Sequence, residues 1–204
     1  MGRVLLSIFG PNRCAACDAP AHENAVFCAG CALVVERIED EHAPFAYGGP
    51  IAAAITRFKY LPVPELARPL GALLASEAQK RDFDDIEAVV PVPLHPTRLF
   101  ERGFNQATLL ARPVARALGV PLLARALVRT RPTPRQAELD RSTRLRNVEN
   151  AFVARTNIRA RVLLVDDVRT TGATQNACAV ALRAAGSPHV RCLVLAIAPA
   201  IGYP

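Results

Sequence analysis

Residues 161–174 read RVLLVDDVRTTGAT, and this stretch decides the fold class. Residues 162–165 are all apolar, which is typical of a short buried strand. Two carboxylates, Asp166 and Asp167, follow at the end of this predicted strand. A turn rich in threonine and glycine comes next, and it leads into an alanine-rich helical pattern over residues 177–185. Ligands of parallel α/β sheets bind at the carboxyl ends of strands, so this order predicts a binding site here.

The turn after the acidic pair suits the phosphate of a sugar phosphate. Backbone N–H groups and the helix dipole favour an anion at a helix N-terminus, and threonine hydroxyls add donors. The two carboxylates can accept hydrogen bonds from ribose hydroxyls. Aspartate at a strand end and glycine before a helix are each common, but an Asp-Asp pair followed by TTGAT is much rarer. The predicted binding residues are Asp166, Asp167, Thr170, Thr171, Gly172, Ala173 and Thr174.

The same stretch resembles the signature of the type I phosphoribosyltransferases, which bind 5-phosphoribosyl 1-pyrophosphate (PRPP). A P-loop is the obvious competing phosphate motif. It requires GxxxxGK[ST], and the chain contains neither that motif nor GxGxxG.

Four cysteines form two CxxC pairs: Cys14, Cys17, Cys28 and Cys31. Paired CxxC knuckles let four thiolates converge tetrahedrally on one Zn²⁺, and four protein sulfurs predict a structural rather than a catalytic ion. Two alternatives remain: disulfides, which need an oxidising compartment, and a redox-active CxxC. A ribbon over residues 12–34 is too small to bury enough apolar surface alone, so we expect the metal to stabilise it. Cys178 and Cys192 are predicted to be buried, inert thiols.

Composition and charge place the chain among globular proteins with an anionic partner. Of its 204 residues, 51% are hydrophobic and 21% charged. No apolar run is long enough to span a membrane, and the apolar patch near the N-terminus is too short for a signal peptide, so we expect a cytoplasmic protein. The net charge is +7, and residues 125–161 alone hold ten arginines against three acidic residues. This excess fits pyrophosphate, a nucleotide or a nucleic-acid backbone, although a solvated surface loop is an equal alternative for most of these arginines.

Strands alternate with helices along the chain, which predicts an α/β fold with a parallel sheet and right-handed crossovers. We expect a phosphoribosyltransferase-like domain over residues 45–200, after the ribbon. Residues 129–147 contain two prolines and show no clear period, so we predict a mobile loop there. Helices are predicted over residues 50–60, 64–81 and 103–118, and strands over 86–93, 121–128, 151–154 and 190–198.

A second constellation, PVPLHPTRLFERGFNQ, occupies residues 91–106 after the predicted strand that ends at residue 93. A proline-stiffened loop at a strand end can present backbone N–H groups, and Arg98 and Arg102 supply fork-shaped donors for pyrophosphate. Asn105 and Gln106 are predicted to hold this loop against the next helix. For the other two notable side chains, we expect Phe104 to pack in the core and His95 to be a hydrogen-bonded loop residue rather than a base.

Together these motifs resemble the ComF (competence protein F) family of bacterial phosphoribosyltransferase-like proteins. The resemblance covers about residues 12–198. The matching stretches are the double-CxxC ribbon, AYGGPI (46–51), RFKY (57–60), VPVPLHPTRLFERGFNQA (90–107), RPTPRQAELDRSTRLRNVENAF (131–152) and VLLVDDVRTTGAT (162–174).

The resemblance implies a type I phosphoribosyltransferase core behind a zinc ribbon. Asp166 and Asp167 would hold the ribose hydroxyls, residues 170–174 the 5′-phosphate and residues 94–102 the pyrophosphate, with Mg²⁺ bridging pyrophosphate and ribose oxygens. Residues 129–147 would form a lid. It also implies a role in natural transformation, handling single-stranded DNA alongside a competence helicase and recombination-mediator proteins.

Two functions stay open at this point. The chain is either a PRPP-binding module that handles DNA in competence, or an active phosphoribosyltransferase that transfers phosphoribose from PRPP to a base or amine. In the enzyme, Asp166 and Asp167 are the candidate catalytic residues, and Asp167 is the better candidate for acid–base work near the anomeric carbon. Arg169 would add a phosphate donor or point to solvent.

Overall fold

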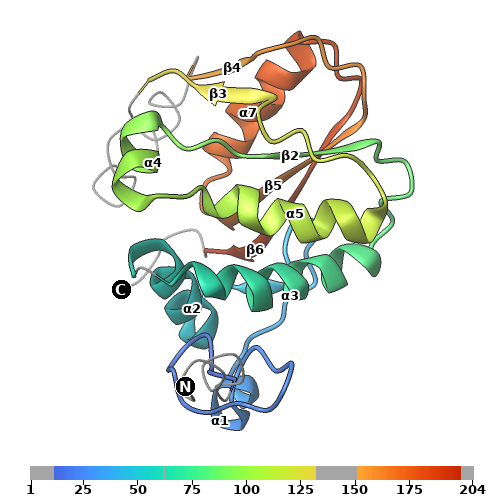
Figure 1. Ribbon diagram of the computed structural model, residues 1–204. Helices are drawn as coiled ribbons and strands as arrows, with labels where there is room; N and C mark the ends of the chain where they lie inside the picture. Colours follow the sequence, from blue (N-terminus) through green and yellow to red (C-terminus); the bar gives the residue numbers. More distant parts are fainter. Residues whose placement is uncertain (1–11, 62, 132–150, 199–204) are drawn as a thin grey trace, which may run out of the picture.

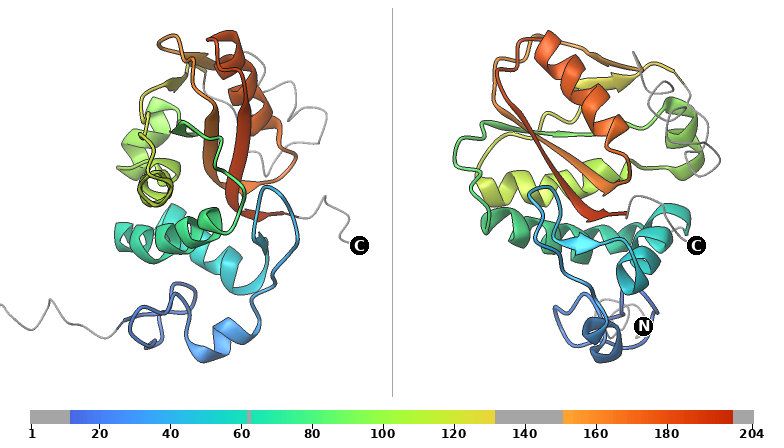
Figure 2. Two further views of the ribbon diagram at one scale, coloured as in Figure 1. Left: turned by 90° about the vertical axis from the view of Figure 1, so that its right-hand side faces the viewer. Right: turned by 180° about the vertical axis from the view of Figure 1, so that it is seen from behind.

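The computed structural model describes residues 12–61, 63–131 and 151–198. A four-stranded parallel sheet in the order β1-β6-β5-β2 forms its centre, and helices cover both faces (Figures 1 and 2). The helices are α1 (Ala29–Leu33), α2 (Gly49–Tyr60), the short 3₁₀ helix η1 (Pro64–Leu66), α3 (Ala67–Gln79), α4 (Pro96–Arg102), α5 (Gln106–Leu118) and α7 (Ala173–Ala184). The strands are β1 (Phe45–Ala46), β2 (Ala88–Pro91), β3 (Leu127–Arg129), β4 (Phe152–Ala154), β5 (Val162–Arg169) and β6 (Val190–Ile197). This confirms the predicted fold class.

The central strand β5 separates two hydrophobic cores. Successive strand residues point to opposite faces of a sheet. Leu163 and Val165 pack with α2, α3 and α5, whereas Val162 and Leu164 pack with α7 and the antiparallel β3–β4 pair. The continuous apolar run of β5 therefore reflects burial on both faces, as in other parallel sheets.

The two crossovers that flank β5 run in opposite directions across the sheet. After α5 the chain returns to the outer edge of β2, where Leu122 forms a parallel bridge with Val89. After β5 the chain passes through α7 to β6, on the other side of β5. Connections of one hand that diverge in this way place α5 and α7 on opposite faces. The strand order reverses between β2 and β5, and in α/β sheets a ligand crevice lies at the carboxyl ends of such strands.

The structure corrects three local predictions. First, β5 does not stop before the acidic pair but continues through Asp166 and Asp167 to Arg169. Second, residues 96–102 form helix α4 rather than a loop, since Pro96 begins the helix and Gly103 ends it at a φ of +81°. Third, residues 121–128 form the bridge at Leu122 and the first part of β3 rather than one strand.

The other predicted elements correspond to α2, to η1 with α3, to α5, and to β2, β4 and β6. Most of the predicted lid, residues 132–147, lies outside the described residues. Within the described ranges, no helix combines the length and apolar character that crossing a membrane requires.

Candidate functional site

The four cysteines of the two CxxC pairs converge on one point. Every Sγ atom of the set lies within 4.8 Å of the other three. The Cys17 and Cys28 Sγ atoms are 3.7 Å apart, close to the edge of about 3.8 Å that four Zn–S bonds of about 2.3 Å give in a tetrahedron. A disulfide would require about 2.05 Å, and all six cysteines are free. The set could therefore bind zinc.

The thiols of this cluster differ strongly in acidity. Although burial opposes it, backbone N–H groups of Cys17, Cys28 and Ala16 lower the pKa of Cys14 to about 6. Burial and the neighbouring sulfurs raise the pKa of Cys31 to about 12. Four adjacent thiolates repel one another, so the set cannot ionise completely without a cation among the sulfurs. The donor chemistry thus fits a soft divalent metal such as Zn²⁺.

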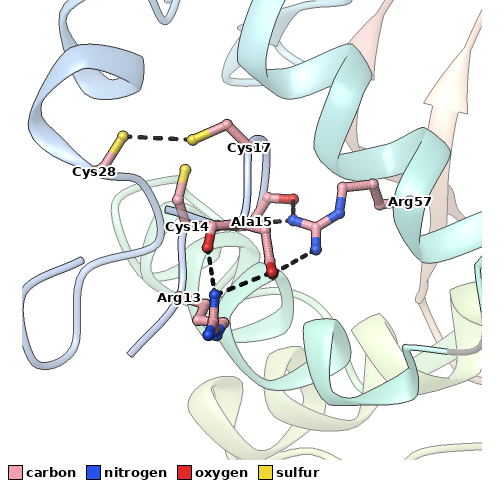
Figure 3. A network of polar contacts seen from close by, with 7 residues as sticks. Arg13, Cys14, Ala15, Cys17, Cys28 and Arg57 are labelled. Carbon is pink, nitrogen blue, oxygen red and sulfur yellow. Dashed lines mark hydrogen bonds and ion pairs between the residues drawn. The ribbon is translucent and has the colours of Figure 1, made fainter. Parts of the chain in front are cut away.

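A single arginine of α2 attaches the cysteine ribbon to the sheet domain (Figure 3). Arg57 donates to the carbonyl oxygens of Cys14 and Ala15, at 2.9 and 3.0 Å, and to Asp18 Oδ1 at 2.7 Å. The Asp18 carboxylate, whose pKa is lowered by its bond to Arg57, also pairs with Arg13 at 3.2 Å. Ala15 is fully buried in the core shared with α2 and α3, so the ribbon and the sheet domain form one packed unit.

The two aspartates at the carboxyl end of β5 point to opposite faces of the sheet. Asp167 follows the parity of Leu163 and Val165 and faces α2, where its Oδ1 lies 2.7 Å from Lys59 Nζ. Both partners are largely buried, with 9% of the Asp167 side chain and 22% of the Lys59 side chain exposed. Burial would lower the pKa of Lys59, but the nearby carboxylates of Asp167 and Asp166 outweigh it and raise the pKa. Lys59 therefore keeps its positive charge at neutral pH.

Asp166 faces α7 and is held by two donors. Gln175 Nε2 donates to its Oδ2 at 2.8 Å, and the backbone N–H of Asp167 donates to its Oδ1 at 2.9 Å. Burial and the neighbouring Asp167 carboxylate raise the pKa of Asp166 to about 7, against the opposing effects of Lys59 and the two donors. Both protonation states are thus accessible near neutral pH, which suits a group that exchanges a proton with a substrate.

The predicted phosphate turn links β5 to α7 through Gly172, whose backbone conformation favours glycine over residues with a side chain. Gly172 is the N-cap of α7 with φ +77°, in the left-handed region that side chains with a Cβ disfavour. The Arg169 side chain lies against this turn: a Cβ added at residue 172 would be 3.0 Å from Arg169 Nε. Thr171 Oγ1 accepts a bond from the Ala173 N–H at 3.4 Å. The Arg169 guanidinium therefore lies over the turn that follows the two aspartates.

Helix α4 brings the second predicted constellation to the same end of the sheet (Figure 1). Arg102 donates to Gln106 Oε1 at 2.7 Å, and Asn105 caps α5 while its amide donates to the Val92 carbonyl at 3.0 Å. His95 Nδ1 accepts from the Thr97 N–H. These contacts confirm the predicted bracing by Asn105 and Gln106 and the predicted hydrogen-bonding role of His95.

The remaining predicted residues are placed as follows. Phe104 packs against the core, 5.6 Å from the ring of Phe58, as predicted. Cys178 is fully buried, as predicted, whereas Cys192 is only partly buried. Burial raises the pKa of both thiols, that of Cys192 to about 12, which disfavours the reactive thiolate.

Three residues near the site were not predicted as site residues from the sequence: Lys59, Gln175 and Arg129. Lys59 lies in the RFKY stretch and is one of only two lysines among 25 basic residues, which could have singled it out. Gln175 follows the TTGAT signature directly. Arg129 is 8% exposed at the end of β3, with its guanidinium 5.4 Å from the centre of the Phe152 ring. It was predicted to begin a mobile lid, but it belongs to a strand.

Several curated proteins are similar to this chain over most of its length. It is 36% identical to competence protein F of Haemophilus influenzae, over 71% of this chain and 67% of that protein. It is 32% identical to the DNA utilization protein YhgH of Escherichia coli K12, over 79% and 73%. It is 30% identical to competence protein ComFC of Bacillus subtilis, over 79% and 67%. No family model matches the chain.

The chain is also similar to solved structures of a PRPP amidotransferase and a purine phosphoribosyltransferase. The glutamine PRPP amidotransferase of B. subtilis, complexed with ADP and GMP, has a TM-score of 0.47 and 19% identity. The match covers 68% of this chain and only 30% of the amidotransferase chain. The purine phosphoribosyltransferase of Pyrococcus horikoshii has a TM-score of 0.43 and 15% identity, over 68% of this chain and 78% of that one.

Two of these relatives are named as competence proteins F and ComFC and the third as a DNA utilization protein, and all three match at 30–36% identity over two thirds or more of their own length. This chain therefore belongs to the ComF family of competence and DNA utilization proteins.

Proposed function

We propose that this protein binds PRPP with Mg²⁺ at the carboxyl end of β5, and that it handles single-stranded DNA in natural competence. In this proposal a structural Zn²⁺ is held by Cys14, Cys17, Cys28 and Cys31. We assign the zinc ribbon to residues 12–34 and the phosphoribosyltransferase-like domain, which would bind PRPP, to residues 45–200.

One observation carries the PRPP proposal. The two aspartates and the adjacent Gly172 turn lie at the end of the sheet where the strand order reverses, and the arginines of α4, from a much earlier part of the sequence, lie at the same end. Residues 170–174 would hold the 5′-phosphate at the N-terminus of α7, and the carboxylates of Asp166 and Asp167 would accept from ribose hydroxyls. Arg98 and Arg102 would bind pyrophosphate. Mg²⁺, when bound, would neutralise charge between pyrophosphate and ribose oxygens.

The DNA part of the proposal rests on the relatives and on the charge distribution. The relatives are named for competence and DNA utilization. Residues 12–43 carry two arginines against six acidic residues, whereas residues 44–204 carry 22 basic and 12 acidic residues. A tetrathiolate zinc centre would make the ribbon still more negative. We therefore expect the DNA backbone to contact the sheet domain rather than the ribbon.

A second candidate function is a catalytically active phosphoribosyltransferase. The observation that favours it is Asp166, whose pKa is raised to about 7 beside the predicted ribose site. A carboxyl with such a pKa can exchange a proton with an attacking base or amine at neutral pH. In this candidate function the acid–base role belongs to Asp166. The sequence favoured Asp167 for that role, but Asp167 forms an ion pair with Lys59. Release of pyrophosphate in the presence of a purine, pyrimidine or ammonia acceptor would establish the enzyme.

Calorimetric titration tests the PRPP proposal. We expect PRPP to bind one site per chain in the presence of Mg²⁺, and a variant with Asp166→Ala and Asp167→Ala to bind at least tenfold more weakly. Asp85→Asn is the control, because Asp85 pairs with Arg191 and His189 elsewhere on the molecule. No heat from the folded wild-type protein at millimolar PRPP would refute the proposal.

A further inference from the structure

Four exposed apolar side chains lie on α2 and α4, two elements that also carry residues of the candidate site. Tyr60 and Leu61, at the end of α2, are 64% and 48% exposed, and Leu99 and Phe100, on α4, are 42% and 91% exposed. We call these four residues the Tyr60 patch. Within the described ranges, the two aromatic side chains among the exposed large apolar residues both belong to it. Figures 1 and 2 show α2 and α4 at the same end of the molecule.

Arg102 joins the two halves of the Tyr60 patch. Its guanidinium carbon lies 5.5 Å from the centre of the Tyr60 ring, which is a cation–π contact. The same guanidinium donates to Gln106 Oε1 at 2.7 Å, and Gln106 is 1% exposed. The arginine is thus fixed from behind by a buried amide, and it holds the tyrosine ring in place. Leu99, three residues before Arg102, lies on the same side of α4.

The Tyr60 patch is also next to the candidate PRPP site. Tyr60 directly follows Lys59, whose ammonium pairs with Asp167 at 2.7 Å. Burial lowers the pKa of Arg102, and the nearby Asp167 carboxylate opposes this effect, so Arg102 lies close to the same ion pair. An aromatic ring therefore lies within one residue of the ion pair at the site.

We propose that the Tyr60 patch is a stacking surface for an unpaired nucleobase. Aromatic rings and arginine planes stack on bases of any sequence, and nearby cations attract the phosphate backbone. Here a braced arginine supports a largely exposed ring, and Arg98 and Arg102 supply positive charge. The base belongs to single-stranded DNA, so this proposal rests on the DNA-binding function proposed above.

Fluorescence of 2-aminopurine tests the proposal, since stacking quenches this base and the chain contains no tryptophan. The first probe is an oligothymidylate with one central 2-aminopurine, and the second is free 2-aminopurine riboside. We expect quenching by the wild-type protein and by Tyr60→Phe, which keeps the ring. Tyr60→Ala should weaken binding about fivefold or more, because one stacked base contributes that much to affinity. Leu33→Ala is the matched control, since Leu33 is 86% exposed on α1.

The outcomes separate this proposal from the function on which it rests. Binding of the oligonucleotide with little binding of the riboside supports single-stranded DNA as the ligand, and riboside binding as tight as oligonucleotide binding would overturn it. Equal affinity and quenching for Tyr60→Ala and wild type would overturn the proposal, and so would absence of quenching by the folded wild-type protein at low salt. PRPP with Mg²⁺ is titrated in parallel. Base binding without PRPP binding would refute the PRPP site while leaving the stacking surface intact.

Discussion

Replacing Lys59 with methionine tests whether the ion pair with Asp167 is a buried element of the site. The chain has two lysines, and each forms a short ion pair: Lys59 with Asp167 at 2.7 Å and Lys80 with Glu77 at 2.8 Å. They differ in exposure, because 22% of the Lys59 side chain and 60% of the Lys80 side chain is exposed. Lys80→Met is therefore a matched control.

The expected loss follows from what each substitution leaves behind. Without Lys59, the Asp167 carboxylate remains buried beside Asp166, and removing one partner of a buried pair costs about 3–5 kcal/mol. Arg102 lies near enough to compensate in part, so we expect about 3 kcal/mol for Lys59→Met. For a chain of this size that corresponds to a Tm lower by roughly 6–12 °C. Lys80→Met should cost about 1 kcal/mol or less, since Glu77 keeps Arg37 at 2.8 Å.

Thermal and urea unfolding followed by circular dichroism measure these differences. The double variant with Lys59→Met and Asp167→Asn should recover at least half of the loss, because it leaves no unpaired buried charge. Since the pKa of Lys59 is raised, the pair's contribution should persist across pH 6–9 and disappear only above the usual lysine range. A Lys59→Met variant as stable as Lys80→Met, or no recovery in the double variant, would refute the reasoning.

Three further substitutions test other parts of the account. The pKa of about 7 means that native Asp166 keeps a proton that the unfolded chain releases near pH 4. Wild-type stability therefore falls as the pH rises between these values, and Asp166→Asn should gain about 2–3 kcal/mol relative to wild type between pH 5 and pH 8; a pH-independent difference in urea unfolding would contradict this. Gly172→Ala should cost about 1–2 kcal/mol in the same assay, because residue 172 has φ +77° and a Cβ would press on Arg169; an equally stable variant would disprove the strain. Arg57→Met should release zinc to a chelator faster than Arg13→Met, because Arg57 holds two ribbon carbonyls; equal release rates would count against the clamp.

Local patterns in the sequence predicted the frame of the molecule well. The apolar run of β5, the alanine-rich helix and the paired CxxC motifs each predict their own local structure from a few neighbouring residues. Helix α4 carried its own signals, with Pro96 at the start and Gly103 at the end. The three prolines before Thr97 instead favoured a loop, so these signals were misread.

The site could be predicted as a set of residue types but not as an arrangement. Ending the strand at Val165 hid the period of two that sends Asp166 toward α7 and Asp167 toward α2. The partner of Asp167 comes from Lys59, more than a hundred residues earlier, and no local pattern encodes such a pairing. Tertiary packing decides it, as it decides the burial of Arg129.

A structure of the chain crystallised with PRPP and Mg²⁺ tests the central claim most directly. The account predicts the 5′-phosphate against the N–H groups of residues 170–174, and the ribose hydroxyls within hydrogen-bonding distance of Asp166 or Asp167. PRPP bound elsewhere on the molecule, or a site still empty at saturating PRPP in a lattice that leaves this end of the sheet open, would contradict it.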